Sequence, residues 1–472
     1  MLKRLKNSKL EIALLSLDAK EHLAFRKFLQ SPFFNQREDV LKLYDFIKKQ
    51  LAQQQPIEGA AAWAFIFPEK AYKAATFRLI GSYLFKLLQQ FLVVQTVPLE
   101  GPYFKRKLTT IWRDQTAEAL RAKAIGEAER QLERAPLRDA SFHHEAYLLW
   151  DEKYRLAYQT KPEAGHHLEP LDQALNLAFI ALKLRKTCLL LAHAKVYKLD
   201  FQPSLVSALF TFIEQQGLLK YPAVSIYYYC IKMQQEEDAS HNFQQFKSVL
   251  LAHGQHFEQA ELRDLHKLAI NFAIKQVNDG HRAYFVDIMD FYEDGLENRY
   301  LIENGRLSRF TYHNIVAVAL QLERTDWAEH FIQEWTRQLD PRFKERMESF
   351  NRAKIAYAKK EYTTAIGLLQ RSNYHDLLLN LGARALLLKI YVELDEYEAL
   401  DSHLEAFQSY LTRKAALGYH RTNYRKLIYY TKKILQLAPS AAKARAQLQE
   451  RIEAEPILTE KTWLLEQLAC RR

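Results

Sequence analysis

Almost every window of this 472-residue chain places its apolar side chains at the i, i+3 and i+4 spacing of an amphipathic helix. Helix breaks recur about every 15–30 residues, which suits helices of three to eight turns joined by short loops. No convincing period-2 strand is apparent, and no Asn-Gly or Asp-Gly hairpin flanked by alternating apolar residues is expected. The sequence therefore predicts an all-α chain of roughly twenty helices, with antiparallel helix pairs as the natural unit.

Composition agrees with a large helical core and excludes several other classes of protein. Apolar residues make up 48 % and aromatic residues 12 % of the chain, which is too much for a disordered protein. Gly and Pro number 13 each, too few for a collagen-like chain or a turn-rich all-β domain. Cys188, Cys230 and Cys470 are too widely spaced for a disulfide scaffold or a paired-cysteine metal knuckle, and so few cysteines suit a reducing compartment.

The chain contains no uncharged apolar window of the length that a membrane span needs. Near the N-terminus the apolar stretch 12–17 has six residues, which is too short for a signal-peptide core. The longest uncharged apolar windows, 59–68 and 174–182, fall well short of the roughly 18–20 residues that cross a bilayer. We therefore expect a soluble cytoplasmic protein with no membrane partner.

Breaks in the helical pattern divide the chain into four parts. We expect an N-terminal helical cap at 1–97, a diverged helical-hairpin array at 98–307, a repeat block at 308–437 and C-terminal capping helices at 438–472. In the first part the turn 31–35, Ser-Pro-Phe-Phe-Asn, interrupts the helices, and Phe33 and Phe34 are expected to pin it into the core. The linker 97–102 could act as a hinge between two modules. A compact multi-helix domain followed by a short repeat block is the competing architecture.

The clearest internal repeat lies in the C-terminal third. Trp327, Tyr362 and Tyr397 are each 35 residues apart, and each follows an acidic turn residue and opens an amphipathic helix. The preceding helices carry small residues where partners can pack closely: Ala317, Ala319, Ala353, Ala356, Ala383 and Ala385. This pattern resembles the tetratricopeptide repeat, whose period is about 34 residues. The resemblance covers roughly residues 308–437 and implies a right-handed α-solenoid of antiparallel helix pairs.

A second resemblance covers the whole chain. Together with its helical pattern, the Ser-Pro-Phe-Phe-Asn turn makes the chain similar to a family of uncharacterised bacterial helical proteins. That resemblance implies no activity.

Signatures of catalysis and of cofactor binding are missing from the sequence. Neither a Gly-rich phosphate loop nor a nucleophile or zinc-protease motif occurs, so we expect no cofactor and no catalytic residue. The best metal candidate is the set His253, His256 and His266, for which solvated or hydrogen-bonded histidines are the simpler interpretation. Cys188 and Cys230 are expected to be small core residues, and the tyrosines 227–229 are expected to pack between neighbouring helices.

One segment differs from the rest in charge. Residues 413–472 hold 13 Lys or Arg and five acidic residues, so they carry +8 of the net charge of +11. The stretch 413–445 has nine basic residues and no acidic one. On its expected helix 419–437, cations alternate with tyrosines on the outer side, a pattern that could hold an acidic peptide or a nucleic-acid backbone. The candidate binding residues are Arg421, Arg425, Lys426, Tyr429, Tyr430, Lys432 and Lys433. A solvated basic face that caps the last repeat is the alternative.

Three functions are compatible with these observations. The first is a non-catalytic protein–protein interaction scaffold that presents an extended helical-repeat surface to a protein partner. The second is a nucleic-acid-binding regulatory protein that uses the basic helix. The third is an enzyme with a helical active site, which would need a deep pocket with convergent polar groups and strongly shifted pKa values.

Overall fold

In the computed structural model the protein is all-α, as the sequence predicts, apart from one short hairpin. The structure describes residues 8–115, 117–160, 162–164, 167–235, 238–371, 376–414, 417–438 and 441–470. These residues contain 23 α-helices, and short 3-10 turns lie at Pro162–Ala164, Leu218–Lys220, Gly254–His256 and Thr336–Gln338. The chain folds into two compact units, one of residues 1–135 and 141–178 and one of residues 136–140 and 179–472. The boundary between the two units passes through the long helix α9 (Leu168–Tyr197). The division of the chain into four parts that the sequence suggests stays a prediction.

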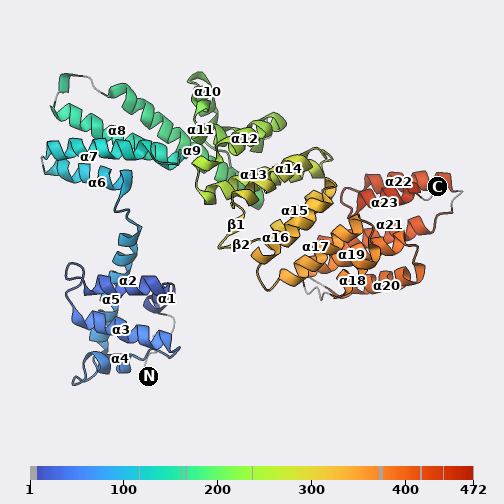
Figure 1. Ribbon diagram of the computed structural model, residues 1–472, viewed down its shortest axis with the longest axis horizontal. Coiled ribbons are helices and arrows are strands. Elements are labelled where there is room, and N and C mark those ends of the chain that lie inside the picture. The colour runs from blue at the N-terminus through green and yellow to red at the C-terminus, as the bar shows by residue number, and fades with distance from the viewer. Residues whose placement is uncertain are drawn as a thin grey trace. The chain divides into compact units, whose positions relative to one another are not determined.

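The first unit contains the blue to cyan helices of Figure 1. They are α1 (Lys9–Leu15), α2 (Ala19–Gln30), α3 (Glu38–Ala52), α4 (Gly59–Ile66), α5 (Ala74–Thr96), α6 (Gly101–Asp114), α7 (Glu118–Glu133) and α8 (Ala140–Thr160). Helices α1 to α5 enclose one apolar core, which runs from Leu10 to Phe91. A capping box starts α2, because Asp18 and Glu21 each accept a hydrogen bond from the other's backbone N–H.

The turn after α2 differs from its sequence prediction. The side chain of Asn35 holds it by donating to the carbonyl oxygens of Leu29 and Arg37 at 2.8 and 3.0 Å. Phe34 stacks on Phe28 with 4.1 Å between ring centroids, but Phe33 is 87 % exposed. The prediction that both rings pin the turn is therefore wrong for Phe33, whose ring centroid lies 5.0 Å from that of Phe34 and whose ring faces solvent.

Helix α5 is more apolar than the sequence windows had indicated. By length and composition alone it could cross a bilayer, with a mean hydropathy of 1.2 over 18 residues. Arg78 and Lys86 interrupt its apolar run, so the helix does not stand out in the sequence as one long uncharged window. A third of that window is buried, and side chains from Phe77 to Phe91 pack in the apolar core of α1 to α5. A core helix of a folded domain can have the same length and hydropathy, so these two properties alone are weak evidence for a membrane span.

A buried charge cluster joins α7 to α8. The guanidinium of Arg121 is 1 % exposed and donates to Glu152 Oε2 at 3.1 Å. Arg113 of α6 also donates to Glu152, at 3.1 Å from Oε1. Since Glu152 is itself 5 % exposed, these cations supply the partners that its carboxylate loses on leaving water.

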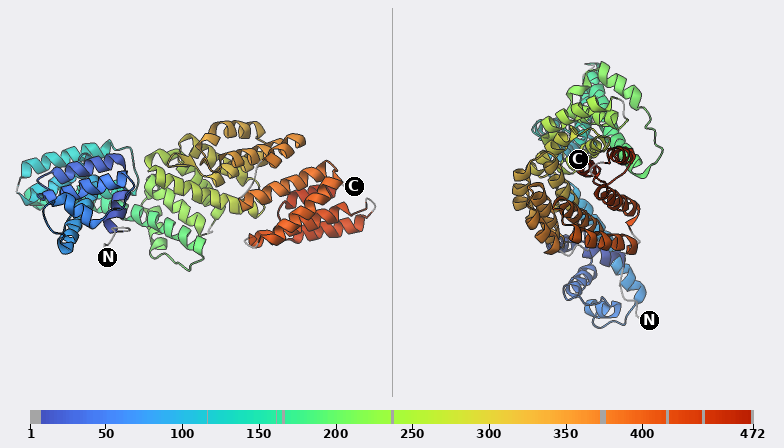
Figure 2. Two further views of the ribbon diagram at one scale, coloured as in Figure 1. Left: turned by 90° about the horizontal axis from the view of Figure 1, so that it is seen from below. Right: turned by 90° about the vertical axis from the view of Figure 1, so that its right-hand side faces the viewer.

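The second unit contains the remaining helices. They are α10 (Val206–Gln215), α11 (Pro222–Gln234), α12 (Ala239–His253), α13 (Gln259–Asn278), α14 (Tyr284–Glu297), α15 (Arg309–Gln321), α16 (Thr325–Trp335), α17 (Lys344–Ala358), α18 (Tyr362–Arg371), α19 (Leu377–Glu393), α20 (Tyr397–Arg413), α21 (Tyr419–Leu435), α22 (Ala442–Ala454) and α23 (Lys461–Cys470). Neighbours in sequence pack as pairs, among them α11 with α12, α13 with α14 and α17 with α18. Figure 2 shows the same succession of helices from two further sides.

A small antiparallel hairpin corrects the expectation of no strands. Strands β1 (Ile302–Glu303) and β2 (Arg306–Leu307) pair Ile302 with Leu307 and Glu303 with Arg306. The turn is Asn304-Gly305, and both residues have positive φ, at 51° and 75°. Asn-Gly favours this left-handed turn geometry. The dipeptide was present in the sequence, but the flanking strands are too short for a period-2 pattern to stand out.

Within the repeat-like region, helices also contact their second neighbours. Helix α17 packs on α15, and α19 packs on α17, in addition to the contacts within each pair. Gly382 of α19 allows one such approach, because a Cβ atom there would lie 2.8 Å from Cζ of Phe350 in α17. The last helices share a core with the third pair, since buried side chains from Leu381 to Leu468 form one cluster.

Replacing Arg121 tests the buried charge cluster. We expect Arg121→Met to destabilise α7 and α8 by about 3 kcal/mol, because Glu152 stays buried with only Arg113 as its cation. Native-state hydrogen exchange of the α7 and α8 amides measures the change in opening free energy. Lys123→Met, at an exposed position of the same helix, is the control and should leave it unchanged. Equal protection in the two variants would show that Arg121 does not stabilise the buried carboxylate of Glu152.

A pair of glycine substitutions tests the close packing of α19 on α17. Gly382→Ala should destabilise these helices by about 1–3 kcal/mol, because the new methyl group displaces the Phe350 ring. Gly367→Ala in α18 meets no atom within 4 Å, and a better helix former there should stabilise by up to about 1 kcal/mol. Hydrogen exchange of the α17 to α19 amides should therefore show a lower opening free energy for Gly382→Ala and a higher one for Gly367→Ala. Equal changes in the two variants would show that α19 does not pack tightly on α17 at Gly382.

Candidate functional site

The candidate residues of the basic segment lie on two different faces of α21. Arg425, Tyr429, Lys432 and Lys433 line a shallow groove of about 560 Å³ between α20 and α21, together with Gln408, Thr412 and Gln436. The Nζ atom of Lys433 lies 5.8 Å from the centroid of the Tyr429 ring, which is 48 % exposed. No acidic side chain of the described residues lines this groove.

The other candidates on α21 are already engaged within the fold. Lys426 pairs with Glu455, and the Tyr430 hydroxyl donates to the same carboxylate at 2.8 Å. This ion pair lowers the pKa of Glu455. Tyr430 is 6 % exposed, so its predicted place on the outer side is wrong: the end of α22 covers it. Arg421 donates to the Lys414 carbonyl oxygen at 2.8 Å.

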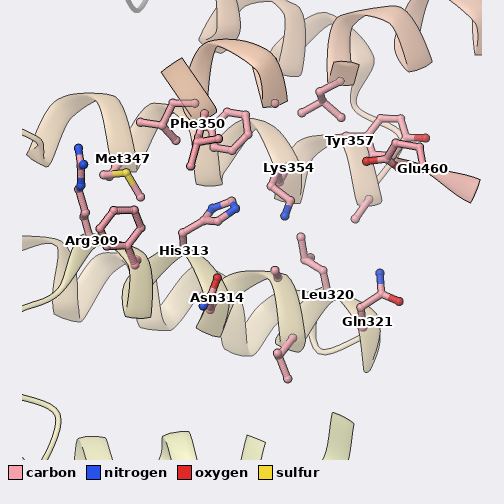
Figure 3. A pocket seen from close by; sticks show the side chains of 18 of the residues that line it. Arg309, His313, Asn314, Leu320, Gln321, Met347, Phe350, Lys354, Tyr357 and Glu460 are labelled. Atoms are coloured by element: carbon pink, nitrogen blue, oxygen red, sulfur yellow. The ribbon is translucent and has the colours of Figure 1, made fainter. Parts of the chain in front are cut away.

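A larger cavity, which the sequence did not reveal, lies in the repeat-like region. It has a volume of about 620 Å³, and its wall comes from α14, α15, α17, α19, α21 and the residue just before α23. Figure 3 shows Arg309, His313, Asn314, Leu320 and Gln321 on one side and Met347, Phe350, Lys354 and Tyr357 on the other. Ala317, one of the small residues noted at the repeat positions, and Gly382 of α19 leave this space open.

Most charged groups on the cavity wall are paired with each other. Arg309 contacts Asp376 at 2.8 Å, and Lys389 contacts Glu460 at 2.8 Å. His313 Nδ1 lies 2.9 Å from Asn351 Oδ1, and burial lowers the pKa of His313 to about 3. The imidazole is therefore neutral at physiological pH and contributes a polar edge without charge.

Lys354 is the exception among the charged groups. It is half-buried, its amine points into the cavity in Figure 3, and no described residue forms a hydrogen bond or ion pair with it. The pKa of Lys354 is lowered to about 8, mainly by burial; the charge of Glu460 opposes this shift, and the charge of Lys389 adds to it. The fold thus holds an amine in an unfavourable environment without giving it a partner.

The metal alternative lacks a suitable geometry in the described part of the chain. His253 and His256 stack with 6.2 Å between ring centroids, but His266 is fully buried and bonded to Asp294 Oδ2 at 2.7 Å. No three His, Cys, Asp or Glu side chains within the described ranges are placed to hold a metal ion.

The core contains Cys188, Cys230, Tyr227 and Tyr228, as the sequence indicated, whereas Tyr229 is only half-buried. Cys188 and Cys230 are both fully buried, and the fold brings their sulfur atoms to 3.0 Å. Burial raises the pKa of the Cys230 thiol, so it is not an activated nucleophile. Tyr227 and Tyr228 are buried and donate to Glu261 and Glu214. Nothing in the sequence indicated that these two thiols meet, because 42 positions separate them.

Comparison with known proteins does not assign the chain to a group. No protein-family model matches it, and no curated protein or solved structure matches it significantly.

Replacing Lys354 tests its placement through the pH dependence of stability. The lysine has a pKa near 10.5 in an unfolded chain and about 8 in the fold, so the unfolded chain binds more protons between these values. The stability of the protein therefore rises with pH across that window. Lys354→Met should be more stable than the original protein by up to about 3 kcal/mol at pH 7.

This stability difference should shrink as pH rises from about 8 to about 10.5. Hydrogen exchange of the α17 and α19 amides, corrected for intrinsic exchange at each pH, measures the difference in opening free energy between the two proteins. Lys344→Met, exposed on the same helix, should show no difference at any pH. A destabilised Lys354→Met at pH 7 would show that the amine has a partner after all.

Proposed function

We propose that this chain is a non-catalytic helical-repeat scaffold that binds a protein segment along the inner surface formed by α15, α17 and α19. The cavity of about 620 Å³ is the observation that carries the proposal, because it opens on this surface and combines apolar walls with a few polar groups. Phe310 and Leu378, which are 58 % and 47 % exposed, border it and offer apolar contacts to a partner. Such exposed apolar groups around a cavity are typical of binding sites.

The proposal includes a tetratricopeptide-like, right-handed solenoid. Support comes from helix starts at 309, 344 and 377, whose spacing is close to one repeat, and from contacts between every second helix. The separate core of α1 to α5 supports an N-terminal cap that precedes the array. Cytoplasmic location belongs to the same proposal.

Two charge substitutions test the scaffold. Affinity capture from the native cell extract should recover one stoichiometric protein with the original chain. Phe310→Glu and Leu378→Glu should each lose that protein, since they place charge on the rim of the cavity. Ile457→Glu, which is 62 % exposed and outside the cavity, should retain it. Equal recovery with all variants would place the partner elsewhere and refute this surface.

Nucleic-acid binding is the second candidate, and the basic groove on α21 favours it. Its three cations, which share the groove with no acidic residue among the described lining residues, could pair with successive phosphates, and Tyr429 could stack on a base. An enzyme is less well supported. The cavity has groups of shifted pKa, but the structure shows no hydrogen bond between a nucleophile and a base among its described wall residues.

Salt dependence tests the nucleic-acid alternative. If the basic groove binds a 20-nucleotide single strand, fluorescence anisotropy should give a log–log salt slope of about −2, for three phosphate contacts. The triple variant Arg425→Gln, Lys432→Gln and Lys433→Gln should abolish binding. Lys426→Gln should retain it, because Lys426 is turned toward Glu455. Absence of binding at low salt would end this alternative.

A further inference from the structure

The charges around the cavity leave one cation in excess. Of the charged residues on its wall, Arg309 is paired with Asp376, and Lys389 is paired with Glu460. His313 is neutral because burial lowers its pKa. The amine of Lys354 is left without a partner among the described residues, so the wall carries one uncompensated positive charge at neutral pH.

The remaining surface of the cavity is mainly apolar. Phe285, Phe310, Leu320, Met347, Phe350 and Leu386 contribute rings and aliphatic groups, and Ala317 and Gly382 leave room between them. A volume of about 620 Å³ lies within the range of about 300–1,000 Å³ typical of sites that enclose an organic ligand. A suitable occupant therefore has an apolar body of that size.

We propose that this cavity binds a ligand with an apolar body and a single carboxylate, and that the carboxylate pairs with Nζ of Lys354. The proposal deepens the scaffold function, because it identifies the chemistry that the inner surface recognises. The same chemistry occurs in an acidic side chain flanked by apolar residues in a peptide and in a free long-chain carboxylate. The peptide is the source that the scaffold function requires.

The number of charges selects a monoanion. One ammonium group balances one negative charge, and a partly buried ion pair is stabilising only when both members are compensated. A phosphate dianion would bring a second charge into the cavity, where the other cations, Arg309 and Lys389, are already bonded to carboxylates. A neutral ligand would leave the lysine without a partner and would forgo the stronger charge-assisted hydrogen bond.

Binding should also depend on pH. A carboxylate against Nζ favours the ammonium form, so the complex takes up a proton wherever free Lys354 is neutral. Affinity should therefore fall by about tenfold for each pH unit above about 8. Tyr424, whose pKa is raised to about 12, and Tyr357, whose pKa is also raised, keep their protons in this range. The titratable and charged residues on the wall are Arg309, His313, Lys354, Tyr357, Asp376, Lys389, His420, Tyr424 and Glu460.

Calorimetry with dodecanoate, and with dodecanol as its uncharged counterpart, tests the proposal on the full-length chain. Dodecanoate should bind, and Lys354→Met should weaken it by about 10- to 100-fold. Lys354→Arg should restore binding and remove the loss above pH 8. Lys344→Met, at an exposed position of the same helix, should behave as the original protein. Dodecanol should bind equally to the original chain and to Lys354→Met.

A displayed library of random dodecapeptides distinguishes the two sources of the carboxylate. Selection on the original chain should enrich peptides with one Asp or Glu among apolar residues, and selection on Lys354→Met should lose that enrichment. Dodecanoate binding without peptide enrichment would assign the site to small amphiphiles.

Two outcomes overturn the anion site: equal dodecanoate affinity in the original chain and in Lys354→Met, or neither dodecanoate binding nor acidic-peptide enrichment. Failure of the affinity capture alone refutes the scaffold and leaves the anion site standing.

Discussion

The structure depends on the burial of apolar helix faces against neighbouring helices. A single amphipathic helix cannot bury its own apolar stripe, and a single pair buries only part of it. In the repeat-like region each first helix therefore packs both on its own partner and on the first helix of a neighbouring pair, as α17 does on α18 and on α15. The series ends where α22 and α23 join the core of the third pair and cover its last apolar face.

This mode of packing also creates the cavity. Small residues bring neighbouring helices close at some levels, while the larger side chains at other levels line the space that remains. Gly382 illustrates the first case, since the ring of Phe350 occupies the place of a Cβ atom. Charged groups that reach this space lose part of their hydration, and within the described part of the chain all of them but Lys354 have a partner of opposite charge. The partly buried amine of Lys354 lowers the stability of the free protein. This cost is the reason for proposing that it binds a ligand and does not serve to stabilise the fold.

The two candidate sites differ in their electrostatics. On the outside of α21 the cations of the basic groove remain near solvent, so their attraction for an anion is long-range and is screened by salt. Inside the cavity the field of Lys354 acts over a few ångströms in a less polar environment, so it favours one well-placed anionic group. The outer groove suits a polyanion, and the inner cavity suits a ligand that is mostly apolar.

The sequence by itself determined the fold class, because the 3.6-residue period, the scarcity of Gly and Pro and the 35-residue repeat are local patterns that residues carry wherever they lie. It also pointed to the tyrosines and cysteines that pack in the core. Only the tertiary structure decided which side chains meet: Lys426 and Tyr430 turn to Glu455, Cys188 approaches Cys230, and Phe33 faces solvent. The cavity around Lys354 likewise combines residues of α14, α15, α17, α19 and α21 with Glu460, and its first and last members, Phe285 and Glu460, are about 175 positions apart in the sequence. No periodic pattern encodes such a set, because its members share a place only after the helices have stacked.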